Sequence, residues 1–93
     1  MRTVEYATAF KKDFKRVKAT PHHKDIDTLL KDVLQRLMND QPLSVGQRDH
    51  ALTGNWSGYR ECHLKPDLLL IYKKPNGETL RIARLGSHSE LFR

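Results

Sequence analysis

The chain has 93 residues, of which 38% are hydrophobic and 30% charged, and its formal net charge at pH 7 is +6. This length suits one compact domain spanning residues 1–93 and excludes a second independent core, while the share of hydrophobic residues excludes a disordered chain. The excess of lysine and arginine over acidic residues favours a polyanionic partner such as RNA or the ribosome, although basic surfaces also serve solubility alone.

The first segment predicts a strand and then a basic helix. Thr3–Tyr6 carry β-branched and aromatic side chains typical of a strand, and Thr8 is placed to cap a helix over Ala9–Ala19. Several lysines lie outside the apolar stripe of this helix. Lys11 and Lys15 therefore suit either a solvated surface or contact with an RNA phosphate backbone.

A second helix is predicted by apolar residues that recur at three- and four-residue intervals between Ile26 and Met38. Thr20 and Pro21 suit its N-cap and first turn, and the polar, proline-containing stretch 39–46 ends it. No apolar run approaches the about 20 residues that cross a bilayer, and the N-terminus carries no apolar leader. We therefore expect no membrane contact, no export and a cytoplasmic location.

From His50 onward, short β-rich runs broken by glycine and proline predict a sheet. Leu68–Tyr72 is a continuous apolar run, typical of a central strand covered on both faces, and Asn76-Gly77 favours a hairpin whose return strand is Thr79–Leu85. With Thr3–Tyr6 added at an edge, we expect an α+β fold in which two N-terminal helices pack on one face of a small, mainly antiparallel sheet.

Side chains suited to catalysis gather in this sheet half, at strand ends and turns. They are three histidines, one carboxylate and two arginines: His50, His63, His88, Asp67, Arg81 and Arg84. RNA supplies its own nucleophile in the 2′-hydroxyl, so its cleavage needs only a base, an acid and stabilisation of charge. Two imidazoles suit the two proton transfers, and an arginine suits the negative charge of the transition state. The sequence therefore favours RNA cleavage without a metal or another cofactor.

Asp67 and two aromatic residues, Phe92 and Trp56, each have an expected role in this half of the chain. Asp67 is expected to orient a histidine or accept a proton, unless it only forms the turn after Pro66. Phe92 is expected to stack on a base, unless it anchors the end of the chain in the core. Trp56 is expected to pack beneath the turn 54–58.

One long motif and three short ones carry a resemblance to a known family. They are Asp49–Asp67 (DHALTGNWSGYRECHLKPD), Leu70–Tyr72, Arg84–His88 and Leu91–Phe92. In these motifs the chain resembles the YafQ branch of the RelE/ParE toxin superfamily, and the similarity covers essentially the whole chain. Such toxins can carry a tryptophan directly after the aspartate, where this chain has Leu68, so the resemblance leaves codon preference open.

This resemblance implies a RelE-like fold and the toxin component of a type II toxin–antitoxin system. It implies an mRNA interferase, a ribosome-dependent endoribonuclease that cleaves mRNA in the A site of the 70S ribosome and is silenced by a cognate antitoxin. Because this chain is basic, the antitoxin should be acidic where the two meet. The catalytic positions that carry over are His50, His63, Asp67, Arg84 and His88, with His88 implicated in proton transfer. Phe92 carries over as a contact to RNA, and residue chemistry adds Arg81, Lys11 and Lys15.

Three other interpretations stay open from the sequence. A non-catalytic module that binds RNA or the ribosome would show the same basic surface, and a ParE-like toxin that inhibits gyrase would share the fold. The histidines and Asp67 also suit zinc in residue type, but the chain contains no compact ligand motif. The single cysteine, Cys62, excludes a cysteine-based zinc site and an intrachain disulfide, and it fits a reducing compartment.

Overall fold

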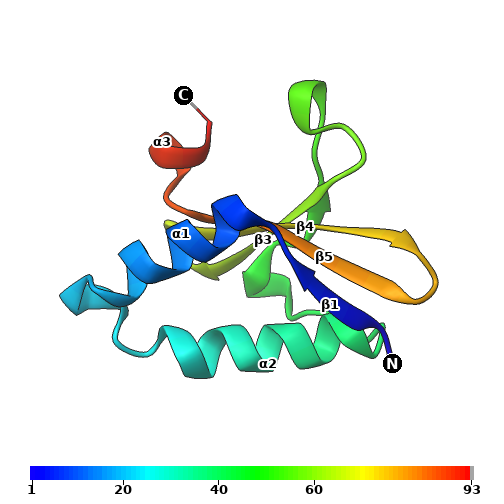
Figure 1. Ribbon diagram of the computed structural model, residues 1–93, viewed down its shortest axis with the longest axis horizontal. Helices are drawn as coiled ribbons and strands as arrows, with labels where there is room; N and C mark the ends of the chain where they lie inside the picture. Colours follow the sequence, from blue (N-terminus) through cyan, green and yellow to red (C-terminus); the bar gives the residue numbers. More distant parts are fainter. Residues whose placement is uncertain (93) are drawn as a thin grey trace.

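Five strands form one sheet with helices on both of its faces, and the computed structural model describes residues 1–92 (Figure 1). The strands are β1 (Thr3–Tyr6), β2 (His50–Ala51), β3 (Arg60–Lys65), β4 (Leu68–Asn76) and β5 (Thr79–Gly86). The α-helices are α1 (Thr8–Lys18), α2 (Ile26–Met38) and α3 (His88–Leu91). The strand order is β1-β5-β4-β3-β2, with β1 parallel to β5 and every other pair antiparallel. The predicted α+β fold with a mainly antiparallel sheet is confirmed.

The middle strand, β4, is buried on both faces, as its uninterrupted apolar run predicted. Successive side chains of a strand point to opposite faces, so the run splits between two cores. Leu68, Leu70 and Tyr72 join the core beneath the helices, whereas Leu69 and Ile71 join a second core on the other face. All five are at most 1% exposed. The β4 strand therefore holds both layers of the molecule together.

The two long helices cover one face of the sheet, with α2 below it in Figure 1. The apolar face of α2 is buried there through Ile26, Leu30, Val33 and Leu37. The α1 helix contributes Phe10 and Val17 to the same core. This layer was predicted from the helical spacing of the apolar residues, and it leaves the opposite face of the sheet free for other segments.

The opposite face carries a smaller core between α3 and the loop that connects β2 to β3, and both rise above the sheet in Figure 1. Ala83 and Leu91 are buried there, and Trp56 and Phe92 pack against them partly buried. The Trp56 ring meets Tyr59 edge-on, with centroids 5.2 Å apart, which confirms its predicted packing role. The α3 helix and the loop between β2 and β3 therefore both project from this face of the sheet.

Both predicted helix caps are wrong. The α1 helix includes Thr8 as its first residue, after Ala7, whose backbone N–H donates to the carbonyl of Ile82 at 2.9 Å. Thr20 precedes a short 3-10 turn at Pro21–His23 rather than α2. Its hydroxyl donates back to the carbonyl of Arg16 at 3.2 Å. In both cases a backbone or local contact replaces the side-chain cap that the residue type favoured.

The short helix α3 was not predicted, although the sequence contains its signal. Ser87 and Glu90 form a capping box: the Ser87 hydroxyl accepts from the Glu90 N–H, and the Glu90 carboxylate accepts from the Ser87 N–H. A serine followed three residues later by glutamate marks a helix start. This box fixes the first residue of α3, which is His88.

The buried Cys62 thiol should be chemically inert in the folded protein. Its side chain is fully buried, and burial, followed by the nearby carboxylates of Asp49 and Glu61, raises the pKa of the thiol to about 12. Only the thiolate reacts with aromatic disulfide reagents. We expect no reaction of native protein at pH 8 over an hour and complete reaction once urea unfolds the chain, followed by absorbance. Rapid modification without denaturant would contradict the burial of β3.

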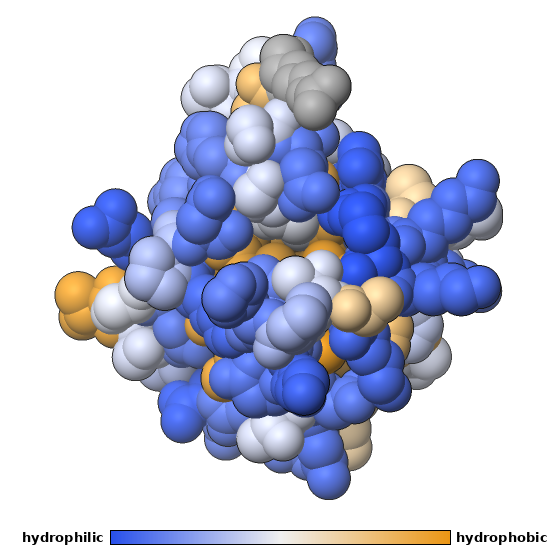
Figure 2. Space-filling model, turned by 90° about the vertical axis from the view of Figure 1, so that its left-hand side faces the viewer, coloured by the Kyte–Doolittle hydropathy of each residue, from blue (hydrophilic) through white to orange (hydrophobic). Residues whose placement is uncertain are grey.

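Figure 2 shows one face on which hydrophilic residues predominate, while apolar residues are visible mainly in a hollow across its middle. Among residues 1–92, every helix is too short or too polar to cross a membrane.

Candidate functional site

The short strand β2 brings His50 against a carboxylate of β3. His50 and Glu61 are partners in the antiparallel register, and His50 Nε2 lies 2.9 Å from Glu61 Oε2. The other ring nitrogen, Nδ1, lies 2.6 Å from the carbonyl oxygen of Arg48. A carbonyl only accepts hydrogen bonds, and so does an ionised carboxylate. Each ring nitrogen of His50 therefore faces an oxygen that can accept a hydrogen bond.

Glu61 is a site residue that the sequence reasoning missed. It is 3% exposed, and its second oxygen, Oε1, has no hydrogen-bond partner within residues 1–92. Burying a carboxylate is costly without a partner, and the His50 imidazole is the partner that the register supplies. The available signal was an acid and a histidine two residues apart, Glu61 and His63, within the β-rich stretch between Gly58 and Pro66. In a strand, this spacing places both side chains on one face.

His88 reaches the same region from α3. A cleft of about 310 Å³ is lined by His50, Leu52, Thr53, Glu61, His88 and Phe92. The rings of His88 and Phe92 lie 5.1 Å apart between centroids, tilted by 45°. Within residues 1–92, neither ring nitrogen of His88 has a hydrogen-bond partner. Two histidines that lie far apart in sequence therefore share one cleft, and His88 is the one whose nitrogens are free.

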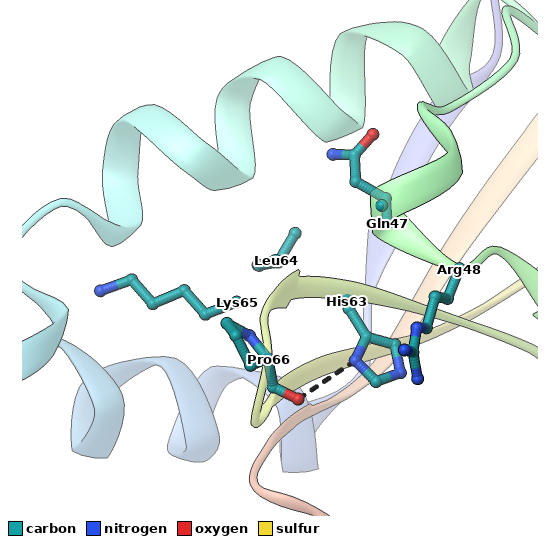
Figure 3. Close-up of a pocket in the computed structure, with 7 residues that line it drawn as sticks. Gln47, Arg48, His63, Leu64, Lys65 and Pro66 are labelled. Atoms are coloured by element: carbon teal, nitrogen blue, oxygen red, sulfur yellow. Dashed lines mark hydrogen bonds between the residues drawn. The ribbon is translucent and has the colours of Figure 1, made fainter.

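His63 lies on the same face of the sheet as Glu61, two residues further along β3. It lines a neighbouring pocket of about 330 Å³ rather than the cleft that holds His50 and His88. Its Nδ1 donates to the carbonyl of Pro66 at 3.2 Å (Figure 3). A neutral ring bonded in this way carries its hydrogen on Nδ1 and leaves Nε2 as an acceptor. The Nε2 atom of such a ring is therefore left able to accept a hydrogen bond.

Asp67 acts on the backbone of α3 rather than on an imidazole. It lies in the turn between β3 and β4, and its Oδ1 accepts a hydrogen bond from the backbone N–H of His88 at 3.0 Å. The carboxylate therefore ties the start of α3 to the sheet. This contact positions the residue that carries the free imidazole, whereas the sequence suggested contact with a ring.

Arg84 is directed away from the cleft, toward a buried aspartate on α1. Its Nε donates to Asp13 Oδ2 at 2.6 Å and its Nη2 donates to Asp13 Oδ1 at 3.1 Å. Asp13 also accepts from the backbone N–H of Leu85 at 3.0 Å and from Arg16 Nη1 at 2.9 Å. The Arg84 charge is therefore already neutralised, and its pKa is raised by these bonds to Asp13 against the opposing effect of burial. The structure does not place Arg84 in the cleft.

The remaining residues predicted to bind RNA also lie outside the cleft. The Arg81 guanidinium pairs with Glu5 of β1, with Nη2 3.3 Å from Oε1. Lys11 and Lys15 are exposed on α1, the helix that covers the other face of the sheet. Lys11 lines an apolar groove there together with Tyr6, Phe10, Phe14 and Leu30. Of the predicted RNA contacts, only Phe92 lines the cleft.

Within residues 1–92, no three His, Cys, Asp or Glu side chains come together in a way that could hold a metal ion. The imidazole of His50 contacts Glu61 and the carbonyl of Arg48, whereas His63 lies in a different pocket.

Comparison with known proteins identifies the family. A family model described as a bacterial toxin of type II toxin–antitoxin systems, YafQ, matches residues 2–93. The chain belongs to the YafQ toxin family. A curated YafQ relative, the mRNA interferase toxin YafQ of Escherichia coli strain K12, is 40% identical over 91 residues, which are 98% of this chain and 96% of the relative.

Solved structures of YafQ relatives share the fold. YafQ in the E. coli DinJ–YafQ complex matches with a TM-score of 0.84 at 39% identity, covering 100% of both chains. A metal-bound toxin from Helicobacter pylori matches with a TM-score of 0.83 at 44% identity, covering 99% of this chain and 100% of that one. The expected family and fold are therefore confirmed for the chain as a whole.

The residue at which this chain departs from the YafQ pattern, Leu68, is buried in the core. Leu68, at the position where such toxins can carry tryptophan, is 1% exposed and packs in the core beneath α1 and α2. It therefore offers no surface to the cleft on the other face. Phe92 is the aromatic side chain that lines this cleft.

Proposed function

We propose that this chain is the toxin of a type II toxin–antitoxin pair and acts as a ribosome-dependent endoribonuclease that cleaves mRNA in the A site. The observation that carries the proposal is the cleft that His50 and His88 both line, with His63 on the same face of the sheet. Two imidazoles in one cleft of a chain with a net charge of +6 suit RNA, whose 2′-hydroxyl is an internal nucleophile. The name mRNA interferase, given to the E. coli relative, agrees with this chemistry.

In the proposed reaction the 2′-oxygen attacks the adjacent phosphorus and the bond to the 5′-oxygen of the next nucleotide breaks. His63 accepts the 2′-hydroxyl proton at Nε2, the nitrogen left free by its bond to Pro66. His88, whose ring nitrogens are free within residues 1–92, donates a proton to the leaving 5′-oxygen. His50, held between Glu61 and the Arg48 carbonyl, stabilises the negative phosphorane as an imidazolium. The products are a 2′,3′-cyclic phosphate and a 5′-hydroxyl.

The other predicted residues take supporting places in this proposal. Phe92 stacks on a base next to the scissile bond, and Asp67 holds the start of α3 in place. Arg84 acts through Asp13 on the fold rather than on the phosphate. Arg81, Lys11 and Lys15 contact the RNA of the ribosome, which surrounds a factor in the A site on more than one side.

The proposal includes a cognate antitoxin and a cytoplasmic location, where ribosomes translate mRNA. The chain carries a net charge of +6, so an acidic antitoxin would be attracted to it over long range. The E. coli relative has been solved in complex with DinJ. Co-expression of the neighbouring reading frame should relieve growth arrest caused by this chain.

The test combines programmed ribosomes with analysis of the RNA ends. Purified protein is added to 70S ribosomes that hold a defined codon in the A site, and to the same mRNA without ribosomes. We expect cleavage only on the ribosome, with a 5′-hydroxyl on one fragment and a cyclic phosphate on the other. A chelator that removes zinc and copper but leaves magnesium should not change the rate.

Each alternative gives a different result in this test. Ribosome binding without cleavage would favour a non-catalytic module, and inhibition of purified gyrase would favour a ParE-like toxin. A 5′-phosphate product, or loss of activity with the chelator, would contradict attack by the 2′-hydroxyl without a metal.

A further inference from the structure

We propose that Arg48 binds a phosphate of the RNA strand next to the scissile one, in the pocket that it shares with His63. This inference rests on the proposed function, because it names a further substrate contact of the same site. The pocket of about 330 Å³ lies beside the cleft and is lined on one side by Gln47 and Arg48 and on the other by His63, Lys65 and Pro66. Figure 3 shows the Arg48 side chain extending toward the imidazole of His63.

The charge of Arg48 is available, unlike that of the other arginines that the structure describes. Each of the others lies within 4.0 Å of a carboxylate oxygen: Arg2, Arg16, Arg36, Arg60, Arg81 and Arg84. Arg48 has no such partner within residues 1–92, and its side chain is exposed. The planar guanidinium of an arginine can bind two oxygens of one phosphate. Because Arg48 lies beside the proposed catalytic imidazole and has no carboxylate partner, it is suited to bind a phosphate of the RNA.

The second cation of the pocket is already engaged. Lys65 Nζ lies 2.8 Å from Asp25 Oδ1 and donates to the carbonyl of His22 at 2.6 Å. Lys65 therefore connects the edge of the pocket to the start of α2. Arg48 is left as the group in the pocket that can take up a new anion.

The backbone of Arg48 connects the pocket to the catalytic cleft. Its φ is +49°, a left-handed conformation that is unfavourable for a residue with a Cβ, and its N–H donates to the Val45 carbonyl at 3.1 Å. In this conformation its carbonyl accepts from His50 Nδ1 while its side chain reaches the pocket of His63. Arg48 therefore contacts His50 through its backbone and lines the pocket of His63 with its side chain. Strained backbone conformations of this kind concentrate at functional sites.

This arrangement fits a single strand of RNA that crosses the face of the sheet. A scissile phosphate at His50 and His88 has its neighbouring phosphate one nucleotide away along the strand. A pocket that opens beside the cleft and holds a free guanidinium is placed to bind that neighbour. Contacts to phosphates position a strand without reading its sequence, so Arg48 should align the scissile bond for every codon alike.

The test measures coupling between Arg48 and individual phosphates. Single-turnover cleavage on programmed ribosomes is compared for mRNAs that each carry one uncharged methylphosphonate, at the phosphates on either side of the scissile bond. The variants are Arg48→Gln, Arg48→Lys and, as a control for loss of charge, Arg36→Gln on α2. Urea unfolding of Arg48→Gln should match the wild type, because the side chain bonds to nothing in the described part of the chain.

We expect Arg48→Gln to slow cleavage at least about tenfold at all codons, as removal of one charged hydrogen-bond partner does, with Arg48→Lys intermediate and Arg36→Gln unchanged. At one of the tested positions, the methylphosphonate should lower the cleavage rate of the wild type by a similar factor. The same substitution should not lower the rate of Arg48→Gln any further. That non-additivity is the signature of a direct contact. Equal slowing of both proteins at every position, or wild-type rates for Arg48→Gln, would overturn the inference.

A binding measurement separates this inference from the proposed function. A 2′-O-methyl oligoribonucleotide, which cannot be cleaved, is titrated into isotope-labelled protein and followed by NMR. Shifts of the Arg48 side-chain and His63 signals that disappear in Arg48→Gln support the phosphate site even if the wild type cleaves no RNA. Saturable binding without these shifts, or absence of binding, refutes the phosphate site, whether or not cleavage occurs.

Discussion

Replacement of His88 by alanine is expected to lower the single-turnover rate of mRNA cleavage about 10³-fold, the usual size of a lost general acid. His88 is the histidine of the cleft whose two ring nitrogens have no hydrogen-bond partner within residues 1–92. The rate is measured on programmed 70S ribosomes with enzyme in excess. His22→Ala is the matched control, because His22 is exposed in the turn before α2 and should leave the rate unchanged.

A second substitution separates proton transfer from packing. His88 also contacts the Phe92 ring, so alanine removes a contact as well as a proton donor. His88→Gln keeps a polar side chain of similar length but cannot transfer a proton, and it should be as slow as alanine. Both variants should still bind ribosomes with wild-type affinity. Wild-type cleavage by either variant would remove His88 from the reaction, and lost ribosome binding would make its role positional.

Replacement of Asp13 by asparagine is expected to lower the free energy of unfolding by about 3 kcal/mol, the usual cost of breaking a buried ion pair from one side. The Asp13 side chain is 3% exposed and accepts bonds from Arg84, Arg16 and the Leu85 N–H. An asparagine removes the charge that offsets the two guanidinium groups. Equilibrium unfolding in urea measures the loss. Asp27→Asn, which breaks an exposed pair with Lys18, should cost less than about 1 kcal/mol.

The same carboxylate should shape the acid stability of the protein. Burial raises the pKa of Asp13, but the bonds from Arg84, Leu85 and Arg16 outweigh it, so the folded pKa lies below the ordinary value of 3.8. A lowered folded pKa supplies stability that is complete above the unfolded pKa and is lost as the pH falls through the folded pKa. Wild-type stability should therefore decrease below about pH 4 more steeply than that of Asp13→Asn. Parallel curves for the two proteins would contradict the ionised state of Asp13 in the fold.

The strands of the sheet could be predicted wherever the residue types of a single segment were typical of a strand. Thr3–Tyr6 and Leu68–Tyr72 follow from residue type and burial on two faces, and both agree with the structure. The strand β2 has two residues, and its pairing depends on the loop between it and β3 rather than on its own composition. A pattern within one segment cannot supply that register, which is why the partnership of His50 with Glu61 was missed.

The sequence could not show the direction in which its charged side chains point. Arg84 was assigned to the phosphate, yet its partner Asp13 is 71 residues away in the chain and on α1. Lys11 and Lys15 belong to the helix layer, because the orientation of α1 is set by Phe10 and Val17 in the core. Arg48 was overlooked, since its availability is visible only when the partners of the other arginines are known.

The parallel pairing of β1 with β5 ties the start of the chain to a strand completed near its other end, with Thr3 opposite Thr79. During synthesis on a ribosome, β1 and α1 emerge long before the strand on which they rest, so this sheet closes only once β5 has also emerged. Contacts so distant in sequence slow folding. Under the proposed function, the newly made chain is therefore inactive until that point, which gives the proposed antitoxin an interval in which to bind it.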